Sequence, residues 1–279
     1  MTPPDLLPHL ELNTDLARRI IVNFICDAVQ KVGFEKAVIG LSGGIDSALS
    51  AYLTAEALGA ENVKCIRMPY QTSSPDSLSD AQQVIDALGC PHDTVEITDM
   101  AEPLFARFPA MDHQRRGNVM ARLRMIVLYD QSVDFGGLVM GTSNKTEFML
   151  GYTTLFGDSG AAIQPIADLH KHQVRQMARA VGVPGSILDK APSADLWQGQ
   201  TDEDELGYTY DAVDQLLYLL IDQRYRPEEC IAVGFAADFV RRVWRQVRAN
   251  HYKRTMPNVV KISQRTIGQD FLYLRDWSG

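Results

Sequence analysis

The octapeptide Gly40-Leu41-Ser42-Gly43-Gly44-Ile45-Asp46-Ser47 joins a short apolar run that begins at Lys36 to an Ala- and Leu-rich segment that ends before Gly59. The apolar run predicts a strand over residues 36–41, and the segment over residues 46–58 predicts a helix. Two glycines let a ligand approach the backbone closely, and the N–H groups of the loop and of the helix start converge on an anion. The stretch therefore predicts a strand, a phosphate-binding turn and a helix.

The same alternation continues along the chain. Short β-branched runs predict strands over residues 62–68 and 93–97, with a helix over residues 75–88 between them. A fourth strand is expected over residues 137–142, after a helix over about 118–130. Strands that alternate with helices form right-handed crossovers, so we expect an α/β fold with a parallel sheet and helices on both faces. Ligands of such sheets bind outside the carboxyl ends of the strands.

Helical patterns flank this unit. Residues 15–32 predict an amphipathic helix with one apolar stripe formed by Leu16, Ile20, Phe24, Ala28 and Val32. Beyond residue 168 the pattern is helical over about 168–181, 206–222 and 235–250, and a Pro-, Gly- and Asp-rich stretch over 189–205 interrupts it. No repeat, linker or low-complexity segment divides the chain. We expect a single domain over residues 1–279 with a helical C-terminal part.

Composition excludes several classes of protein. The 279 residues carry a formal charge of −8 with 46% hydrophobic side chains, as in ordinary globular proteins. No uncharged apolar run reaches the roughly 18 residues of a membrane span, and residues 1–17 lack the Lys or Arg that begins a signal peptide. These features predict a cytoplasmic location without membrane contact. The four cysteines lie far apart, which argues against a zinc ribbon or a disulfide framework: Cys26, Cys65, Cys90 and Cys230.

One part of the chain is basic. Residues 241–265 hold eight basic side chains and no acidic one: Arg241, Arg242, Arg245, Arg248, Lys253, Arg254, Lys261 and Arg265. A solvated helix face is the ordinary explanation, and a phosphate-rich small substrate is the alternative. The acidic remainder of the chain would repel a polyanion, so we do not expect nucleic acid as a partner.

Asp46 separates this loop from the common nucleotide loops. The Walker pattern needs a Lys after its glycines, and a dinucleotide loop needs G-x-G-x-x-G; neither is present. An Asp beside a phosphate site calls for a cation between them, so Asp46 suggests a Mg²⁺ ligand. Stabilisation of the helix start by the Asp is the alternative.

The loop resembles the SGGxDS signature of the ATP pyrophosphatases, which cleave ATP between the α and β phosphates. Later segments, in their order and spacing, are similar to NAD synthetase: 117–125 (GNVMARLRM), 140–147 (MGTSNKTE), Gly157-Asp158, 190–195 (KAPSAD) and 199–207 (GQTDEDELG). The resemblance covers residues 15–275. It implies an adenine nucleotide alpha hydrolase-like, Rossmann-like fold and a homodimer. The implied activity is that of a ligase that makes NAD, AMP and pyrophosphate from deamido-NAD, ATP and ammonia through an acyl adenylate.

Thr142 and Glu147 follow a predicted strand end, on the same rim as the loop, so Glu147 could complete the cation site begun by Asp46. Taken without the family, Glu147 is a surface carboxylate and Lys171 a solvent-exposed lysine. The resemblance implies Mg²⁺ on Asp46 and Glu147. It also implies an ATP site formed by Gly40, Leu41, Ser42, Gly43, Gly44, Ile45, Asp46, Ser47, Thr142, Lys171 and Ser193. The catalytic residues it implies are Asp46, Lys171 and Asp158, with Asp158 taking a proton from ammonium.

Asn118, Arg122 and Tyr129 share one face of a predicted helix because they are four and seven residues apart. Such residues are ordinarily surface or interface residues, and Arg124 is close enough to be confused with Arg122. The resemblance implies that Asn118, Arg122, Tyr129, Tyr252 and Lys253 bind deamido-NAD.

Two positions depart from the common bacterial pattern. Leu155 stands where ammonia-dependent members commonly have Lys, and Ala162 stands where an acidic residue is usual. These segments are closer to the synthetase part of glutamine-dependent members. About 35 residues precede the first strand, too few for a glutaminase domain, so we expect free ammonia as the nitrogen source. Delivery by a separate glutaminase subunit stays open.

Two rival functions remain at this stage. A tRNA thiolation enzyme of the same superfamily would need a catalytic cysteine and an RNA-binding extension, and the sequence has no motif for either. A nucleotide-binding sensor with the same fold and no chemistry would not need Asp46 together with Glu147.

Overall fold

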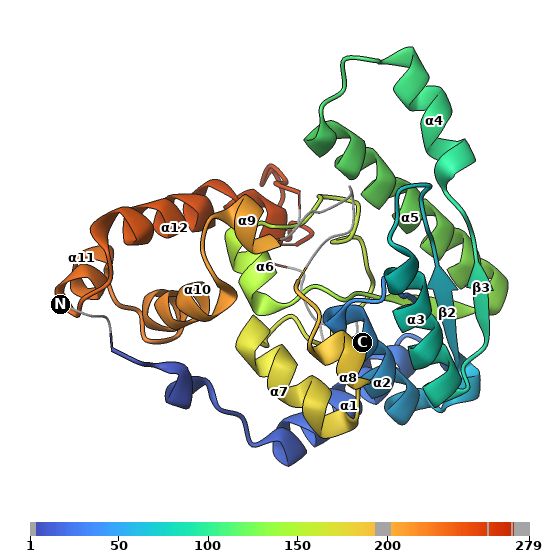
Figure 1. Cartoon of the computed structure of the whole chain (residues 1–279), viewed down its shortest axis with the longest axis horizontal. Coiled ribbons are helices and arrows are strands. Elements are labelled where there is room, and N and C mark those ends of the chain that lie inside the picture. Colours follow the sequence, from blue (N-terminus) through green and yellow to red (C-terminus); the bar gives the residue numbers. More distant parts are fainter. Residues whose placement is uncertain (1–3, 193–201, 256, 269, 271–279) are drawn as a thin grey trace.

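A parallel sheet of four strands forms the centre of the computed structural model, which describes residues 4–192, 202–255, 257–268 and 270 (Figure 1). The strand order is β3-β2-β1-β4, with β1 Lys36–Gly40, β2 Val63–Arg67, β3 His92–Thr94 and β4 Gly137–Met140. All three strand pairs are parallel, and Ala37 of β1 pairs with Val63 on one side and Leu138 on the other. The predicted parallel α/β fold is confirmed.

Both faces of the sheet are buried because side chains alternate along each strand. Ala37 and Ile39 belong to one hydrophobic cluster, and Val38 between them belongs to another. The first cluster includes residues of α1 (Thr14–Gln30), α2 (Ile45–Leu58), α3 (Pro75–Leu88) and α7 (Lys171–Val181). The second includes residues of α4 (Thr98–Arg107) and α5 (His113–Phe135). Helices thus cover each face of the sheet, as predicted.

The C-terminal part of the chain is helical, also as predicted, and has a hydrophobic cluster of its own around the fully buried Tyr210. Its helices lie on the left of Figure 1: α10 (Tyr210–Leu217), the π-helical turn η3 (Tyr218–Asp222), α11 (Pro227–Ala232) and α12 (Ala237–Ala249). The remaining short elements are η1 (Leu7–Leu10), η2 (Ala60–Asn62), α6 (Lys145–Leu150), α8 (Gly185–Leu188), α9 (Asp202–Leu206) and η4 (His251–Arg254).

The apolar stripe predicted for the first helix is not the buried one. Ile21, Ile25 and Val29 of α1 are buried against α2 and α7, whereas Leu16, Ile20, Phe24 and Val32 are exposed. Apolar residues occupy more than one face of this helix, so packing, rather than spacing, selects the face that enters the core.

The third strand is shorter than predicted, and α4 was not predicted, nor were the short helices α6, α8 and α11. β3 ends at Thr94, although the backbone N–H groups of Val95 and Ile97 still donate to Arg67 and Pro69. α4 begins at Thr98, directly after this stretch, and contains Pro103 and several charged residues. Its composition resembles a loop, so only its packing against α5 reveals it.

The order of the strands creates the place for a ligand. β2 and β3 lie on one side of β1, and β4 lies on the other, so the connections after β1 and β4 leave the sheet in opposite directions. The carboxyl ends of two such strands leave a crevice between them, where open α/β sheets bind ligands. The octapeptide Gly40–Ser47 follows β1, and Gly141-Thr142-Ser143 follows β4.

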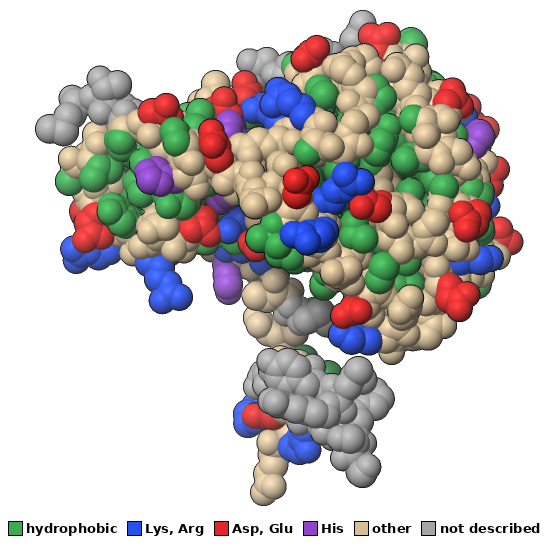
Figure 2. Space-filling model, turned by 90° about the horizontal axis from the view of Figure 1, so that it is seen from below, with side chains coloured by type: hydrophobic (Ala, Val, Ile, Leu, Met, Phe, Trp, Pro, Cys, Tyr) green, Lys and Arg blue, Asp and Glu red, His purple; other side chains and the backbone are tan. Residues whose placement is uncertain are grey.

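The surface carries no large patch of one charge on the face shown in Figure 2, where acidic, basic and hydrophobic side chains are interspersed. Within the described ranges, no helix combines the length and apolar character that a membrane span requires.

Candidate active site

A cavity of about 650 Å³ lies at the carboxyl ends of β1 and β4. Its walls come from the glycine loop, the start of α3, one face of α5, the segment after β4 and the C-terminal part. The cavity has two ends of different composition. The charged end consists of the glycine loop with Asp46, Glu147 and Lys171, and the loop end consists of residues 151–160 with Asn118 and Lys253.

The glycine loop is fixed by its own hydrogen bonds. Ser47 Oγ donates to the Gly44 carbonyl at 2.9 Å and lies 3.1 Å from Ser42 Oγ, and Ser42 Oγ accepts from the Gly44 N–H at 3.2 Å. Gly43 has a φ of +79°, and a Cβ there would lie 2.2 Å from the Ser77 carbonyl oxygen of α3. The backbone therefore approaches α3 so closely that only glycine fits at position 43.

Lys171 connects the two predicted carboxylates. It is the first residue of α7 and is only 2% exposed. Its Nζ lies 2.5 Å from Asp46 Oδ2 and 3.4 Å from Glu147 Oε1, and it also lies over the ring of Tyr210. The structure thus brings together three residues that lie up to 125 positions apart in the sequence.

Neighbouring polar groups hold both carboxylates in place. Asn144 Nδ2 donates to Asp46 Oδ1 at 2.8 Å, and the Asn144 N–H donates to Glu147 Oε2 at 3.2 Å in a capping box that starts α6. Thr146 Oγ1 accepts from the Lys171 N–H and donates to Asp214, which is fully buried. Buried charges of this kind persist only when each is paired and hydrogen-bonded, as these are.

The protonation of the charged end follows from its burial. Burial and the negative charge of Asp46 raise the pKa of Glu147 to about 8, although Lys171 acts in the opposite direction. Burial by itself would lower the pKa of Lys171, but the charges of Asp46 and Glu147 raise it above its ordinary value. Lys171 therefore stays positive, and a second cation near Glu147 would keep that carboxylate ionised.

Asp46 and Glu147 fit a Mg²⁺ ion that a substrate shares. In the described part of the chain, no group of three or more His, Cys, Asp or Glu side chains is arranged to hold a metal ion. Mg²⁺ in nucleotide sites is held by one or two carboxylates together with phosphate oxygens and water, so a full protein cage is not required. Two half-buried carboxylates already converge on one cationic group here, the Lys171 ammonium.

The loop end relies on backbone carbonyls. Lys253 Nζ donates to the carbonyls of Gly151 and Thr153 at 2.7 and 2.8 Å. Asp158 Oδ1 accepts from the Thr154 N–H at 2.7 Å, and Asn118 Oδ1 accepts from Thr154 Oγ1 at 2.7 Å. Contacts with Thr154 and the loop carbonyls thus organise the three predicted residues of this end.

At the loop end, Asp158 and Lys253 influence each other's protonation. Asp158 has an exposed side chain, but the protein around it raises the pKa of its carboxyl group, while the Thr154 N–H and Lys253 act in the opposite direction. Burial lowers the pKa of Lys253, and the charge of Asp158 partly offsets this. Asp158 and Lys253 each bring the other closer to its charged form.

The other predicted residues divide into two groups. Thr142 lines the cavity, as do Gly40, Leu41, Ser42, Gly44 and Ile45 of the loop. Arg122, Tyr129 and Tyr252 are exposed and do not line it: Arg122 Nε donates to the Leu155 carbonyl at 3.2 Å. Ser193 lies outside the described residues. The roles predicted for all of the site residues stay predictions.

Several cavity residues were not singled out from the sequence. Arg124, rather than Arg122, lines the cavity and donates to the Met68 carbonyl. Asp202 also lines it, is 4% exposed, and accepts hydrogen bonds from Tyr152 and Tyr210. Asp202 lies in the segment GQTDEDELG that carries the family resemblance, so its position in that motif was the available signal.

Leu155 and Ala162 are both on the surface side of this region. Leu155 is half-buried beside Arg122, and Ala162 is exposed, with its backbone N–H bonded to the Val139 carbonyl. Neither is among the residues that line the cavity, so the charges missing at these positions leave its described walls unchanged.

Comparison with known proteins identifies the family. The family model for NAD synthase matches residues 17–257. The NH(3)-dependent NAD(+) synthetase of Trichlorobacter lovleyi is 53% identical over 97% of this chain and 99% of its own length. Among solved structures, NMN synthetase from Francisella tularensis has a TM-score of 0.81 at 34% identity, and NH3-dependent NAD synthetase from Campylobacter jejuni has 0.77 at 28%. Each covers 90% of this chain and 100% of its own.

These matches extend over almost the whole chain, and the range of the family model includes the glycine loop and the charged end. The predicted family and fold are confirmed: the chain belongs to the NAD synthase family, ligases that use ATP to form a carbon–nitrogen bond.

Proposed function

We propose that this chain amidates deamido-NAD with ammonia and releases AMP and pyrophosphate. The observation that carries the proposal is the convergence of Asp46, Glu147 and Lys171 beside the glycine loop, at the crevice between β1 and β4. A carboxylate is too stable for direct attack by ammonia, so it must first displace pyrophosphate from the α phosphate of ATP. The charged end stabilises the negative charge that develops on the departing pyrophosphate.

The chain's own groups supply most of this stabilisation. We assign the loop N–H groups and the hydroxyls of Ser42 and Ser47, which line the cavity, to the phosphates, and Lys171 beside Asp46 would contribute a positive charge. Mg²⁺ held by Asp46 and Glu147 would offset further phosphate charge. In the structure the Lys171 ammonium contacts both carboxylates, so phosphate oxygens of bound ATP would compete with them for this ammonium.

The second half of the reaction belongs to the loop end. The acyl adenylate reacts with ammonia, which bears a lone pair only after ammonium has lost a proton. Asp158 lies at the cavity, and its raised pKa makes it a better proton acceptor than an ordinary aspartate. Asn118 and Lys253 line the same end, and we assign them to the dinucleotide.

A homodimer would bring the remaining predicted residues to a substrate. Tyr129 shares an exposed face of α5 with Ile126 and Val133, at spacings of three and four residues, and Arg122 is exposed on the same helix. The exposed residues of α1 form a second apolar stripe. Burial of such a face against a second copy would place Arg122 and Tyr129 at an interface. The homodimer stays a prediction, and so does the cytoplasmic location.

The test is direct synthesis by the purified chain. With ATP, Mg²⁺, deamido-NAD and ammonium chloride, we expect equal amounts of NAD and AMP. Glutamine as the sole nitrogen donor should give essentially none, since a glutaminase needs its own cysteine nucleophile with a positioned base, and none of the four cysteines lines the cavity among the described residues. NAD from glutamine with the isolated chain would contradict the nitrogen source, and activity only in extract would indicate a separate glutaminase.

The similarity to the NMN synthetase of Francisella tularensis supports a second candidate substrate, nicotinic acid mononucleotide. The reacting carboxylate is the same, and only the adenylate half of the dinucleotide is missing. A parallel assay with the mononucleotide decides between the two substrates. We expect kcat/KM to be at least about tenfold higher for deamido-NAD, because the mononucleotide lacks the adenylate half and its charge-assisted contacts. A higher value for the mononucleotide would reassign the substrate.

A further inference from the structure

The start of α3 forms a second wall of the phosphate site. Because the Ser77 carbonyl lies against Gly43, the first turn of α3 touches the glycine loop directly. Ser74 and Ser77 of this turn line the cavity. Any phosphate bound by the loop N–H groups therefore lies near the side chains that this turn holds.

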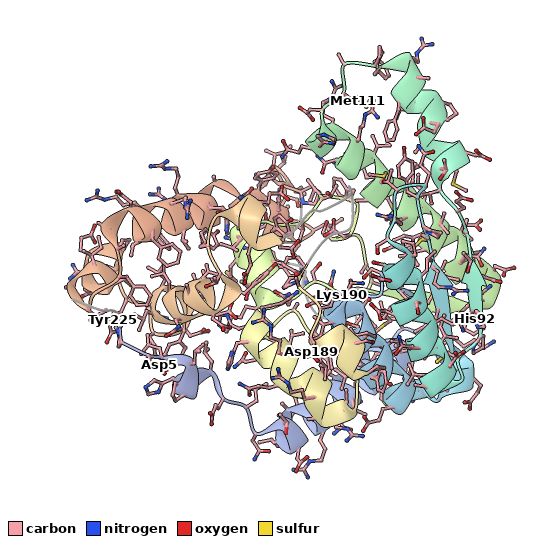
Figure 3. The ribbon with its side chains drawn as sticks, in the orientation of Figure 1. Asp5, His92, Met111, Asp189, Lys190 and Tyr225 are labelled. Atoms are coloured by element: carbon pink, nitrogen blue, oxygen red, sulfur yellow. The ribbon has the colours of Figure 1, made fainter. Side chains whose placement is uncertain are left out.

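Lys190 reaches this wall from a distant part of the chain. Its Nζ donates to Asp80 Oδ2 at 2.9 Å and to Ser77 Oγ at 3.2 Å, close to α3 in the middle of the molecule (Figure 3). Asp80 Oδ1 also accepts from Ser186, two residues before the end of α8. The Asp80 side chain is 9% exposed, whereas that of Lys190 is 30% exposed and lines the cavity. Asp80 thus holds the Lys190 ammonium from behind.

The lysines at the cavity differ in what already binds them. Among the described residues, Lys171, Lys190 and Lys253 line it. Lys171 is shared by two carboxylates, and Lys253 contacts two carbonyls at the loop end. Lys190 faces one carboxylate and one hydroxyl, and an ammonium group has three N–H donors. Each of the three lysines therefore keeps one donor among the contacts of the described residues. Lys190 differs from Lys171 because its side chain is 30% rather than 3% exposed, and from Lys253 because it lies beside α3 and the glycine loop.

We propose that Lys190 is an ATP-binding residue whose ammonium contacts the phosphate chain from the α3 side of the glycine loop, opposite Lys171. This inference rests on the proposed reaction, which brings ATP to the loop. Two lysines on opposite walls would divide the charge of the departing pyrophosphate between them. Asp80 acts as a positioning residue, because it lies behind the ammonium and is not among the residues that line the cavity.

The test measures binding before turnover. Adenosine 5′-(α,β-methylene)triphosphate with Mg²⁺ cannot be cleaved between the α and β phosphates, so its Kd reports on the site without reaction. Lys190→Met should raise this Kd at least about tenfold, because a charge-assisted contact is lost, and should leave the Kd of adenosine within twofold. Lys190→Arg, which keeps the charge, should recover part of the affinity and controls for folding.

Two further variants separate a phosphate contact from a structural ion pair. Lys64 on β2 is a comparable lysine, because its Nζ lies 2.8 Å from Asp93 Oδ2 and it does not line the cavity. Lys64→Met should therefore leave the Kd unchanged. Asp80→Asn breaks the ion pair of Lys190 but keeps its ammonium, and should change the Kd less than threefold. Equal losses in Lys190→Met and Asp80→Asn, or wild-type affinity in Lys190→Met, would overturn the proposal.

The outcome is independent of whether the wild-type chain makes NAD. If the wild type makes no NAD but Lys190→Met still weakens analogue binding, the proposed function fails and the role of Lys190 stands. If the wild type makes NAD and Lys190→Met binds the analogue normally, the role of Lys190 fails alone.

Discussion

The charged end and the loop end of the cavity are built in different ways. At the charged end, Asp46, Glu147 and Lys171 begin or follow regular elements, and their side chains bind one another. At the loop end, side chains bind backbone carbonyls and N–H groups of residues 151–158. Removing a charge from the charged end leaves the remaining charges there without a partner, whereas removing one from the loop end takes hydrogen bonds away from the loop. Substitution of the charged side chains should therefore lower turnover at the charged end, whereas loss of Lys253 at the loop end should weaken substrate affinity.

The largest effect is expected at the charged end. Asp46→Asn and Glu147→Gln should each lower kcat at least about a hundredfold at saturating Mg²⁺, because each removes charge that stabilises the departing pyrophosphate. Asp76→Asn is a matched control, since Asp76 also lies in the first turn of a helix but is exposed. It should keep kcat within threefold. Near-normal turnover of either active-site variant would remove the metal assignment.

A backbone change tests the rigidity of the same end. Gly43→Ala should lower the free energy of unfolding by about 1–3 kcal/mol and raise KM for ATP at least about tenfold, because alanine disfavours a φ of +79° and its Cβ would collide with Ser77. Chemical denaturation and steady-state kinetics measure the two effects. Gly44→Ala is the comparison, since its Cβ would meet only Ser42 Oγ at 3.2 Å and its φ is −91°. An equal response of both variants would show that the position of the glycine does not matter.

At the loop end we expect an effect on affinity. Lys253→Ala should raise KM for deamido-NAD about tenfold and leave KM for ATP nearly unchanged, because a charge-assisted contact is lost far from the glycine loop. Lys261→Ala removes another charge of the same basic stretch, one that pairs with Asp270 and is exposed, and should change neither KM. Parallel rises in both KM values for Lys253→Ala would contradict the separation of the two ends.

The smallest effect concerns strain beside the loop end. Phe156 has a φ of +59°, a conformation that asparagine tolerates better than phenylalanine. Phe156→Asn should raise the free energy of unfolding by up to about 1 kcal/mol. Arg224→Asn, at a φ of +58° and outside the cavity, should give a similar gain. Lower stability of Phe156→Asn would show that the exposed ring contributes more than the strain costs.

The same contrast explains what the sequence could predict. The glycine loop lies in one continuous stretch, so its residues and its place after a strand were predictable from local pattern. Lys171 and Glu147 were found through the family motif, and only the fold shows that they meet Asp46. Arg122 and Arg124 lie two residues apart on α5 and therefore on different faces of the helix. Only Arg124 lines the cavity, and the spacing of the two residues does not show which face that is.

Other features depend on long-range packing. The exposed stripe of α1 and the missed helix α4 have compositions that do not identify their buried faces. The ion pair of Lys190 with Asp80 joins residues 110 positions apart, and no local pattern signals it.

The chain order of the two ends has a consequence for synthesis on the ribosome. The charged end is complete once Lys171 has emerged, whereas the loop end waits for Lys253, whose ammonium holds the Gly151 and Thr153 carbonyls. Chains generally fold from the N-terminus as they are made. A nascent chain would therefore assemble its charged end roughly eighty residues before it could hold a second substrate, and early nucleotide capture there would stabilise the partly made protein.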